Sequence, residues 1–420
     1  MRVQQLPGNR VSRSTPQALQ PGQIVQGKIM KLYANQTAQI QLGSRKMIAQ
    51  LEASLTVGGR YHFQVQPSDE LIHLRVIGGQ LPKQGAGDEM ELLKQLGFKA
   101  SKSHADLVQT LNKEKIPFTK EQLQGAFRLL NESKSTQQTQ QIIRYMFAAD
   151  LPITRSIYQA MDSVRSTGMT EQMTLLLNQL RRNPNPSNLH QKLMHQLQQM
   201  LEPSLGKPED SFLFASPKEQ LLNHVRQVLQ FTGLNDENVL ATNRMKEQHT
   251  IKSMLLQFLQ QGDGAAQEQS RKLLHFLNGM QLHSVQETAN VLQAHLQLPG
   301  AKLGLSSDMD MQFTGNKTDN GTISTDSCRI LFYLELTNLK ETIVDMHIQK
   351  RAVIVTIYND HEDLRKQSTS LKPKLKEGLK HLDYQLSTLT FQPINEKNQL
   401  DSARVKTAYS KSYQGVDYRI

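Results

Sequence analysis

The chain of 420 residues has few cysteine and aromatic side chains. It contains one cysteine, Cys328, and no tryptophan. A single cysteine excludes an internal disulfide and every metal site built from cysteine pairs. Cys328 lies in the apolar run Cys328–Leu336, so we interpret it as a small hydrophobic residue of a buried strand rather than as a nucleophile.

The motifs of common enzyme classes are also missing. The sequence has no P-loop, no glycine-rich dinucleotide loop, no His-Glu-x-x-His and no Gly-x-Ser-x-Gly. Its best acidic groups, Asp308 with Asp310 and the run His361–Asp363, fall where a strand and a helix are expected to begin. Carboxylates at a helix start are explained by the helix dipole alone. We therefore predict a protein that is not an enzyme and that holds no metal or cofactor.

Long hydrophobic runs are absent as well. No stretch of about 18 apolar residues occurs, so no helix is expected to span a membrane. Residues 1–21 lack the apolar core of a signal peptide. These absences predict a cytoplasmic protein without membrane insertion.

The net charge of +11 is unevenly distributed. Residues 1–79 carry nine Lys or Arg against three Asp or Glu. A basic segment of this kind can bind nucleic acid, or it can be a basic arm with a soluble surface. Both interpretations stay open at this point.

The N-terminal part predicts a disordered arm followed by a small β domain. Residues 1–21 are polar and contain several prolines and glycines, which favours a disordered arm. Residues 22–79 hold five short strand-like runs, and apolar residues alternate in them, as in Tyr61, Phe63 and Val65. This pattern predicts a small closed barrel of the OB or SH3-like kind.

A long helical region is expected next. Residues 80–87 are interpreted as a linker, and from residue 88 to residue 298 the apolar period is helical. Many prolines and glycines divide this region into short helices.

A short motif recurs within the helical region. Ile116–Lys120 (Ile-Pro-Phe-Thr-Lys) is matched 35 residues later by Leu151–Arg155 (Leu-Pro-Ile-Thr-Arg). Thr119 and Thr154 are suited to be N-cap residues, and Gln122 completes a capping box with Thr119. The motif marks either a helical-hairpin repeat or two similar helix starts.

Residues 301–395 return to strand patterns. Strands are expected at Met309–Thr314, Cys328–Leu336, Val344–Ile348, Val353–Ile357 and Leu386–Phe391, with a leucine-bearing helix before the last one. The order β-β-β-β-α-β predicts an α+β domain with one long helix on the face of one sheet. Residues 396–420 are interpreted as a polar tail.

The order of residues in this C-terminal segment resembles that of a known family. Leu334-Glu335-Leu336 and Leu339 precede the two alternating runs, and Arg365 follows them, eight residues before Pro373. This order resembles the substrate-specificity-switch domain of flagellar hook-length control proteins, in a Gram-positive variant. Lys340 and Lys372 stand where that family usually has glycine and leucine.

The resemblance implies a binding role in flagellar type III export. In the family, this domain contacts the cytosolic domain of the export-gate switch protein, which stops hook-subunit export and permits filament-class export. The partner expected here is that cytosolic domain or a homologue. The family's N-terminal part is often itself exported, so both a resident and an exported protein stay open.

Candidate partner-binding residues follow from the resemblance and lie around the expected helix. They are Arg365, Leu371, Pro373, Leu375 and Leu379. Pro373 either kinks one long helix or begins a second, short helix. Arg365 either meets a partner's carboxylate or stays solvated or paired with Glu362 or Asp363.

An alternative function is nucleic-acid binding by the basic barrel. The supporting residues are Lys28, Lys31, Arg45, Lys46, Arg60 and Arg75, with Tyr33, Tyr61 and Phe63. A basic groove with aromatic side chains is how OB folds hold single strands. Tyr61 and Phe63 lie on the same face as Val65, however, which predicts that they belong to the core. We therefore consider nucleic acid a less favoured partner than a protein. A scaffold with neither role is a third interpretation.

Overall fold

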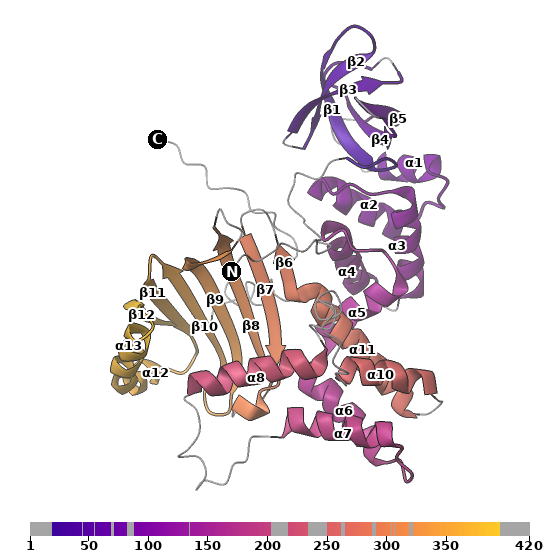
Figure 1. The fold of residues 1–420 in the computed structure, drawn as a ribbon. Coiled ribbons are helices and arrows are strands. Elements are labelled where there is room, and N and C mark those ends of the chain that lie inside the picture. The colour runs from indigo at the N-terminus through magenta and orange to yellow at the C-terminus, as the bar shows by residue number, and fades with distance from the viewer. Residues whose placement is uncertain are drawn as a thin grey trace, which may run out of the picture. The chain divides into compact units, whose positions relative to one another are not determined.

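The computed structural model describes residues 19–43, 45–53, 55–68, 71–81, 88–133, 135–202, 217–233, 250–261, 265–287, 291–303, 305, 307–318 and 322–394. These residues form two compact units that divide between residues 158 and 159. The first unit holds a barrel and helices, and the second holds helices and a seven-stranded sheet (Figure 1). The expected tail (396–420) and most of the expected arm (1–21) and linker (80–87) lie outside the described residues.

Five strands close into the expected small barrel. They are β1 (Ile24–Leu32), β2 (Thr37–Leu42), β3 (Arg45–Leu51), β4 (Arg60–Gln66) and β5 (Ile72–Leu81). Their order is β1-β2-β3-β5-β4, with β3 and β5 parallel and β1 closing on β4. Ile40, Phe63 and Leu74 are fully buried inside. The closure leaves no free sheet edge in this part of the chain.

Five helices follow the barrel. They are α1 (Asp88–Gln95), α2 (Lys102–Glu114), α3 (Lys120–Glu132), α4 (Thr136–Ala148) and α5 (Arg155–Ser166). The capping box is confirmed, because the Gln122 N–H donates to Thr119 Oγ1 (3.2 Å) and the Thr119 N–H donates to Gln122 Oε1 (2.9 Å). Thr154 Oγ1 accepts from the Ile157 N–H (3.4 Å) at the start of α5, so both expected caps are present.

The barrel and the first helices share a hydrophobic core. Ile24 of β1 and Ile77 of β5 are buried in one cluster with Leu93, Leu111 and Phe118. The Ile24 N–H donates to the Phe118 carbonyl oxygen (2.6 Å), which adds a backbone bridge. The barrel is therefore anchored on its helices by apolar contacts that water cannot replace.

The second unit begins with more helices and continues into the sheet. The helices are α6 (Met169–Arg181), α7 (Asn188–Leu201), α8 (Pro217–Thr232), α10 (Ile251–Gln261) and α11 (Ala265–Ser284). The strands are β6 (Val285–Glu287), β7 (Val291–Leu298), β8 (Met309–Lys317), β9 (Ile323–Leu336), β10 (Lys340–Gln349), β11 (Ala352–Tyr358) and β12 (Gln385–Gln392). They follow chain order across the sheet, antiparallel except for the parallel pair β11–β12.

The expected order β-β-β-β-α-β is present as β8 to β12, but the expected helical region is too long. Its end at residue 298 is wrong, because helix ends at Ser284 and β6 and β7 add two strands to the sheet. In β7 the apolar Leu292, Leu296 and Leu298 alternate with polar residues, which is a strand period. Leucine, glutamine and alanine favour helices, so the composition of this segment predicts a helix. Pairing with β8 fixes the strand conformation instead.

The apolar face of the sheet is buried near β7, β8 and β9. Leu298 and Met309 belong to the largest buried cluster, which also contains residues of α6, α7, α10 and α11. Val225 of α8 and Phe332 of β9 pack against the same cluster. The sheet and helices α6, α7, α8, α10 and α11 therefore share one core, and Figure 1 shows α8 lying beside the lower ends of the strands.

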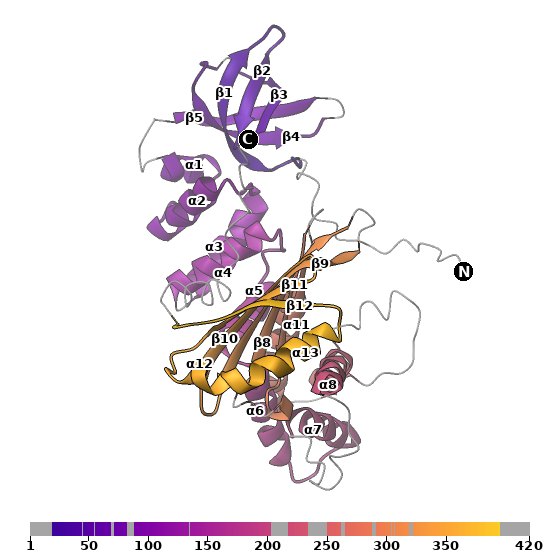
Figure 2. The same cartoon turned by 90° about the vertical axis from the view of Figure 1, so that its left-hand side faces the viewer.

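The expected long helix of the C-terminal segment is three short pieces. These are α12 (Leu364–Gln367), a 3-10 turn (Ser368–Leu371) and α13 (Lys372–Lys380). Pro373 lies in the first turn of α13, where its missing N–H has no helical partner to lose. Of the two interpretations of Pro373, the structure supports a helix start rather than a kink. α13 packs against the edge strand β12 (Figure 2).

The turn between β9 and β10 contains a strained position. Lys340 has φ of 57°, the left-handed region that glycine adopts without steric cost. This is the position where hook-length control proteins usually have glycine. The lysine side chain is exposed, so no buried contact compensates for the backbone conformation.

We expect Lys340→Gly to raise the free energy of unfolding by up to about 1 kcal/mol, because it removes the left-handed strain. Urea unfolding of the full chain measures the change. Glu341→Gly is the matched control, since Glu341 continues into β10 and glycine there should destabilise by roughly 0.5–1 kcal/mol. Destabilisation by both substitutions would contradict the assignment of strain to Lys340.

Candidate partner-binding and nucleic-acid-binding surfaces

The leucines of the α12–α13 segment (residues 364–382) are largely exposed. Leu371, Leu375 and Leu382 are 58%, 38% and 45% exposed, and Leu379 is half-buried. No residue of α12 or α13 is buried. A helix whose leucines stay in contact with water has apolar area available for a partner.

Basic side chains surround these leucines. Residues 364–380 contain one acidic residue, Glu377, and several exposed basic residues. The basic residues are Arg365, Lys366, Lys372, Lys374, Lys376 and Lys380. Asp363 Oδ1 pairs with Lys366 Nζ (3.2 Å), whereas Arg365 makes no ion pair within the described residues. The structure thus leaves the Arg365 guanidinium in water and does not form the local pair that the sequence suggested.

The acidic groups that were weighed as metal ligands have structural roles. Asp308 accepts the Thr170 N–H (3.0 Å) and the Thr170 hydroxyl, so it caps the start of α6 although it lies 138 residues away in the sequence. Asp310 Oδ1 lies 3.5 Å from His295 Nε2 instead. Burial raises the pKa of Asp308, and the bonds from Thr170 partly offset this. Within the described residues, no cluster of three His, Cys, Asp or Glu side chains could hold a metal ion.

The outer face of β1, β2 and β3 is the polar, basic side of the barrel. Buried Ile40 sets the alternation, so Gln39 and Gln41 point outward on β2. Gln41 is paired with Lys28 of β1 and with Lys46 of β3, and Gln39 is paired with Lys31 and Ile48. The named lysines and Ile48 are exposed, Ile48 by 52%. Arg45 and the 47% exposed Tyr33 lie at the ends of the same strands.

Helices cover another side of the barrel. The outward His62 of β4 is 2% exposed, and Asn112 Nδ2 of α2 lies 3.2 Å from its Nε2. α1 packs against β5. Among the described residues, the helices therefore cover β4, β5 and the start of β1 at Ile24, while Lys28, Lys31 and Lys46 of the β1–β3 face stay exposed.

The structure separates the residues that the sequence grouped as a nucleic-acid site. Tyr61 and Phe63 are 5% and 0% exposed, which confirms their core positions. Arg75 lies on β5, where its Nη2 donates to Gln64 Oε1 (2.8 Å). Sequence reasoning missed Gln39, Gln41 and Ile48, although the alternation of Gln39 and Gln41 with Ala38 and Ile40 was a usable signal.

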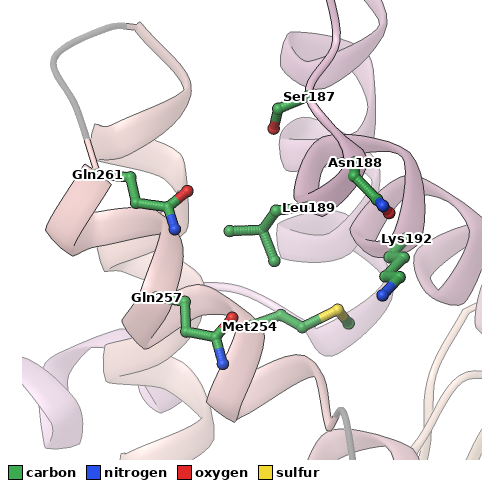
Figure 3. Close-up of a pocket in the computed structure, with 7 residues that line it drawn as sticks. All are labelled: Ser187, Asn188, Leu189, Lys192, Met254, Gln257 and Gln261. Carbon is green, nitrogen blue, oxygen red and sulfur yellow. The ribbon is translucent and has the colours of Figure 1, made fainter.

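A shallow pocket lies between α7 and α10 (Figure 3). Its lining residues are Ser187, Asn188, Leu189, Lys192, Met254, Gln257 and Gln261. Lys192 is its one charged residue, and no acid or base converges with it. The pocket has no set of groups that could perform chemistry.

Among the helices that the structure describes, none combines the length and hydrophobicity of a membrane-spanning segment.

Cys328 lies in β9 as expected but is half-buried, and burial raises the pKa of its thiol. A raised thiol pKa reduces nucleophilicity near neutral pH.

Comparisons with known proteins agree with the barrel. Residues 2–75 match a family model described as the TP0910 S1-like domain. The uncharacterized protein YlqG of Bacillus subtilis (strain 168) is 29% identical over 189 residues, which is 45% of this chain and 32% of YlqG. The chain thus spans about a third of the length of this curated relative. No solved structure matches.

The buried contact between His62 and Asn112 predicts a pH-dependent loss of stability. Burial lowers the pKa of His62 from 6.5 to about 4, and the contact with Asn112 offsets part of this. The unfolded chain therefore binds more protons between pH 4 and 6.5, so this contribution to stability is lost as the pH falls through that interval. We expect a decrease on the order of 2–3 kcal/mol.

His62→Gln should reduce the slope of unfolding free energy against pH in that interval, because glutamine does not titrate. Urea unfolding of the full chain at pH 4.5, 5.5 and 7 measures it, with the signal of the barrel unit followed by hydrogen exchange. An unchanged slope in the variant would show that His62 is not the titrating group.

Proposed function

We propose that this chain is a non-enzymatic interaction protein whose C-terminal segment binds the cytosolic domain of a flagellar-type export-gate switch protein. The observation that carries the proposal is the exposed α12–α13 segment, with leucines Leu371, Leu375 and Leu382 in water beside lysines. Apolar residues within a charged rim are the usual composition of a protein–protein interface. The proposal places the chain on the cytoplasmic side of the export apparatus and allows its own export.

Two structural features support the resemblance behind this proposal. The order β9 to β11, helix, β12 agrees with the strand and helix order that the hook-length control family implies. Lys340 adopts a left-handed backbone at the position where the family usually has glycine. A turn conformation of this kind depends on the backbone and persists when the side chain changes.

Leu375→Asp should weaken binding of the purified export-gate cytosolic domain by tenfold or more, because a buried leucine contributes about 1.5–3 kcal/mol at an interface. Isothermal titration calorimetry of the full chain at moderate salt measures it. The full chain is required, since residues 301–420 alone would lack β6, β7 and the helices that share their core.

Leu256→Asp is the matched control, because Leu256 is 46% exposed on α10, outside the proposed surface. We expect it to bind like the unmodified chain. Equal weakening by both substitutions, or no binding by the unmodified chain at high micromolar concentration, would contradict the proposal.

A second candidate function is single-stranded nucleic-acid binding by the barrel. Lys28, Lys31 and Lys46 gather with outward glutamines on the open β1–β3 face. The strands 2–3 face and the first loop are where OB folds bind oligonucleotides. Tyr33 is exposed at that loop and can stack on a base. The S1-like family model supports the same part of the chain.

The triple substitution of Lys28, Lys31 and Lys46 by Gln should lower affinity for a fluorescent twelve-nucleotide oligo-U. Fluorescence anisotropy over a salt series should show the slope of log K against log salt falling by about 2, since each lost phosphate contact removes about 0.7. The matched control replaces Lys94, Lys99 and Lys102, which are also exposed and lie on the helical side. Equal loss in both triple variants would mean that net charge, and not this face, binds the strand.

A further inference from the structure

The sheet of the second unit ends at a strand with an open side. β12 (Gln385–Gln392) is the last strand in the order β12-β11-β10, and it pairs with β11 in parallel. In the part of the chain that the structure describes, no strand pairs with its other side. The N–H and C=O groups on that side are available for a further strand.

The backbone direction shows which groups face the open side. The Asn359 N–H donates to the Gln392 carbonyl oxygen (2.9 Å), so Gln392 directs its backbone groups toward β11. Alternate residues of a strand in a parallel ladder point these groups to opposite sides. Thr390 therefore also faces β11, and the N–H groups of Leu389 and Phe391 face the open side.

This edge lacks the features that usually protect one. β12 contains no Lys, Arg, Asp, Glu or Pro over its eight residues. Natural edge strands carry such residues, or bulges, to prevent pairing with other chains. The pairing of β12 with β11 has one irregularity in register, near the start of β12, opposite Val353 and Ile354 of β11. The stretch Thr388–Gln392 remains regular and uncharged.

Positive charge lies next to the open edge. α13 packs against β12 and bears four exposed lysines, Lys372, Lys374, Lys376 and Lys380, against one glutamate, Glu377. A second copy of the chain paired edge to edge would bring two such helices together, which like charges oppose. An acidic strand would instead meet opposite charges, which favours it as the occupant.

We propose that the open edge of β12 binds an extended acidic peptide segment of a partner protein by strand addition, with the lysines of α13 contacting its carboxylates. Backbone hydrogen bonds to Leu389 and Phe391 would supply affinity, and the lysines would select acidic sequences. The inference concerns the mode of binding at the C-terminal end of the sheet. It can fail while binding to the export-gate domain stands, and it can hold for a different partner.

The probe is a fluorescein-labelled eight-residue peptide that alternates valine and glutamate, titrated against the full chain at moderate salt. Two further forms carry N-methyl groups on the valines or on the glutamates, so that each lacks the hydrogen-bond donors of one edge. We expect the unmodified peptide and one methylated form to bind and the other form to bind at least tenfold more weakly. A valine–lysine peptide should not bind. Equal binding of both methylated forms, or no binding of the valine–glutamate peptide at millimolar protein, would overturn strand addition.

Leu389→Pro tests the same edge from the protein side, because it removes an N–H that faces the open side. Binding of the peptide should weaken roughly tenfold, the effect of losing one or two backbone hydrogen bonds. Leu389→Ala is the matched control, since it loses the side chain but keeps the N–H, and it should bind within about threefold of the unmodified chain. If Leu389→Pro fails to fold, the methylated peptides decide the question. Concentration-dependent dimerisation that Leu389→Pro abolishes would show that the occupant is a second copy and would overturn the peptide.

Discussion

Burial of the sheet's apolar face is the constraint on which the second unit depends. Alternation in β7, β8 and β9 places Leu298, Met309 and Phe332 on one face, and that face must be removed from water. The cover comes from helices α6, α7, α8, α10 and α11, which precede all seven strands of this sheet in the chain. The C-terminal strands are therefore not an independent module, because their core is completed by upstream helices. The Asp308 carboxylate, which caps α6, adds a polar contact between the residues before β8 and these upstream helices.

The same constraint explains where the unit can bind partners. Helices pack against the apolar residues of β7, β8 and β9. At β12 the sheet packs against α13, which has no buried residue. Leu375 and Leu382 stay in water there, and an uncharged strand edge lies beside lysines. In the first unit, helices likewise cover β4, β5 and the start of β1, and the lysines of the β1–β3 face stay exposed. In both units, the surfaces available to a partner are those that the helices do not cover.

Local patterns allowed much of the fold to be predicted. The barrel, the Thr119 cap and the strands β8 to β12 follow from alternation, turn residues and capping chemistry, which act over a few residues. The strand β7 was missed because helix-favouring residues hid its alternation, and only pairing with β8 resolves the conflict. The role of Asp308 could not be foreseen, because its partner Thr170 lies 138 residues away. The candidate residues from Arg365 to Leu379 were placed on an exposed segment, but the open edge of β12 is a property of sheet order that no local pattern carries.

Hydrogen exchange of the full chain, with and without the purified export-gate cytosolic domain, tests the central claim most directly. The claim is that partners bind at the thinly covered C-terminal end of the sheet, so exchange should slow within residues 364–392, including the amides of Leu389 and Phe391. Exchange in β1 to β5 should not change. Slowed exchange confined to the barrel, or no change anywhere at saturating concentration, would contradict the account.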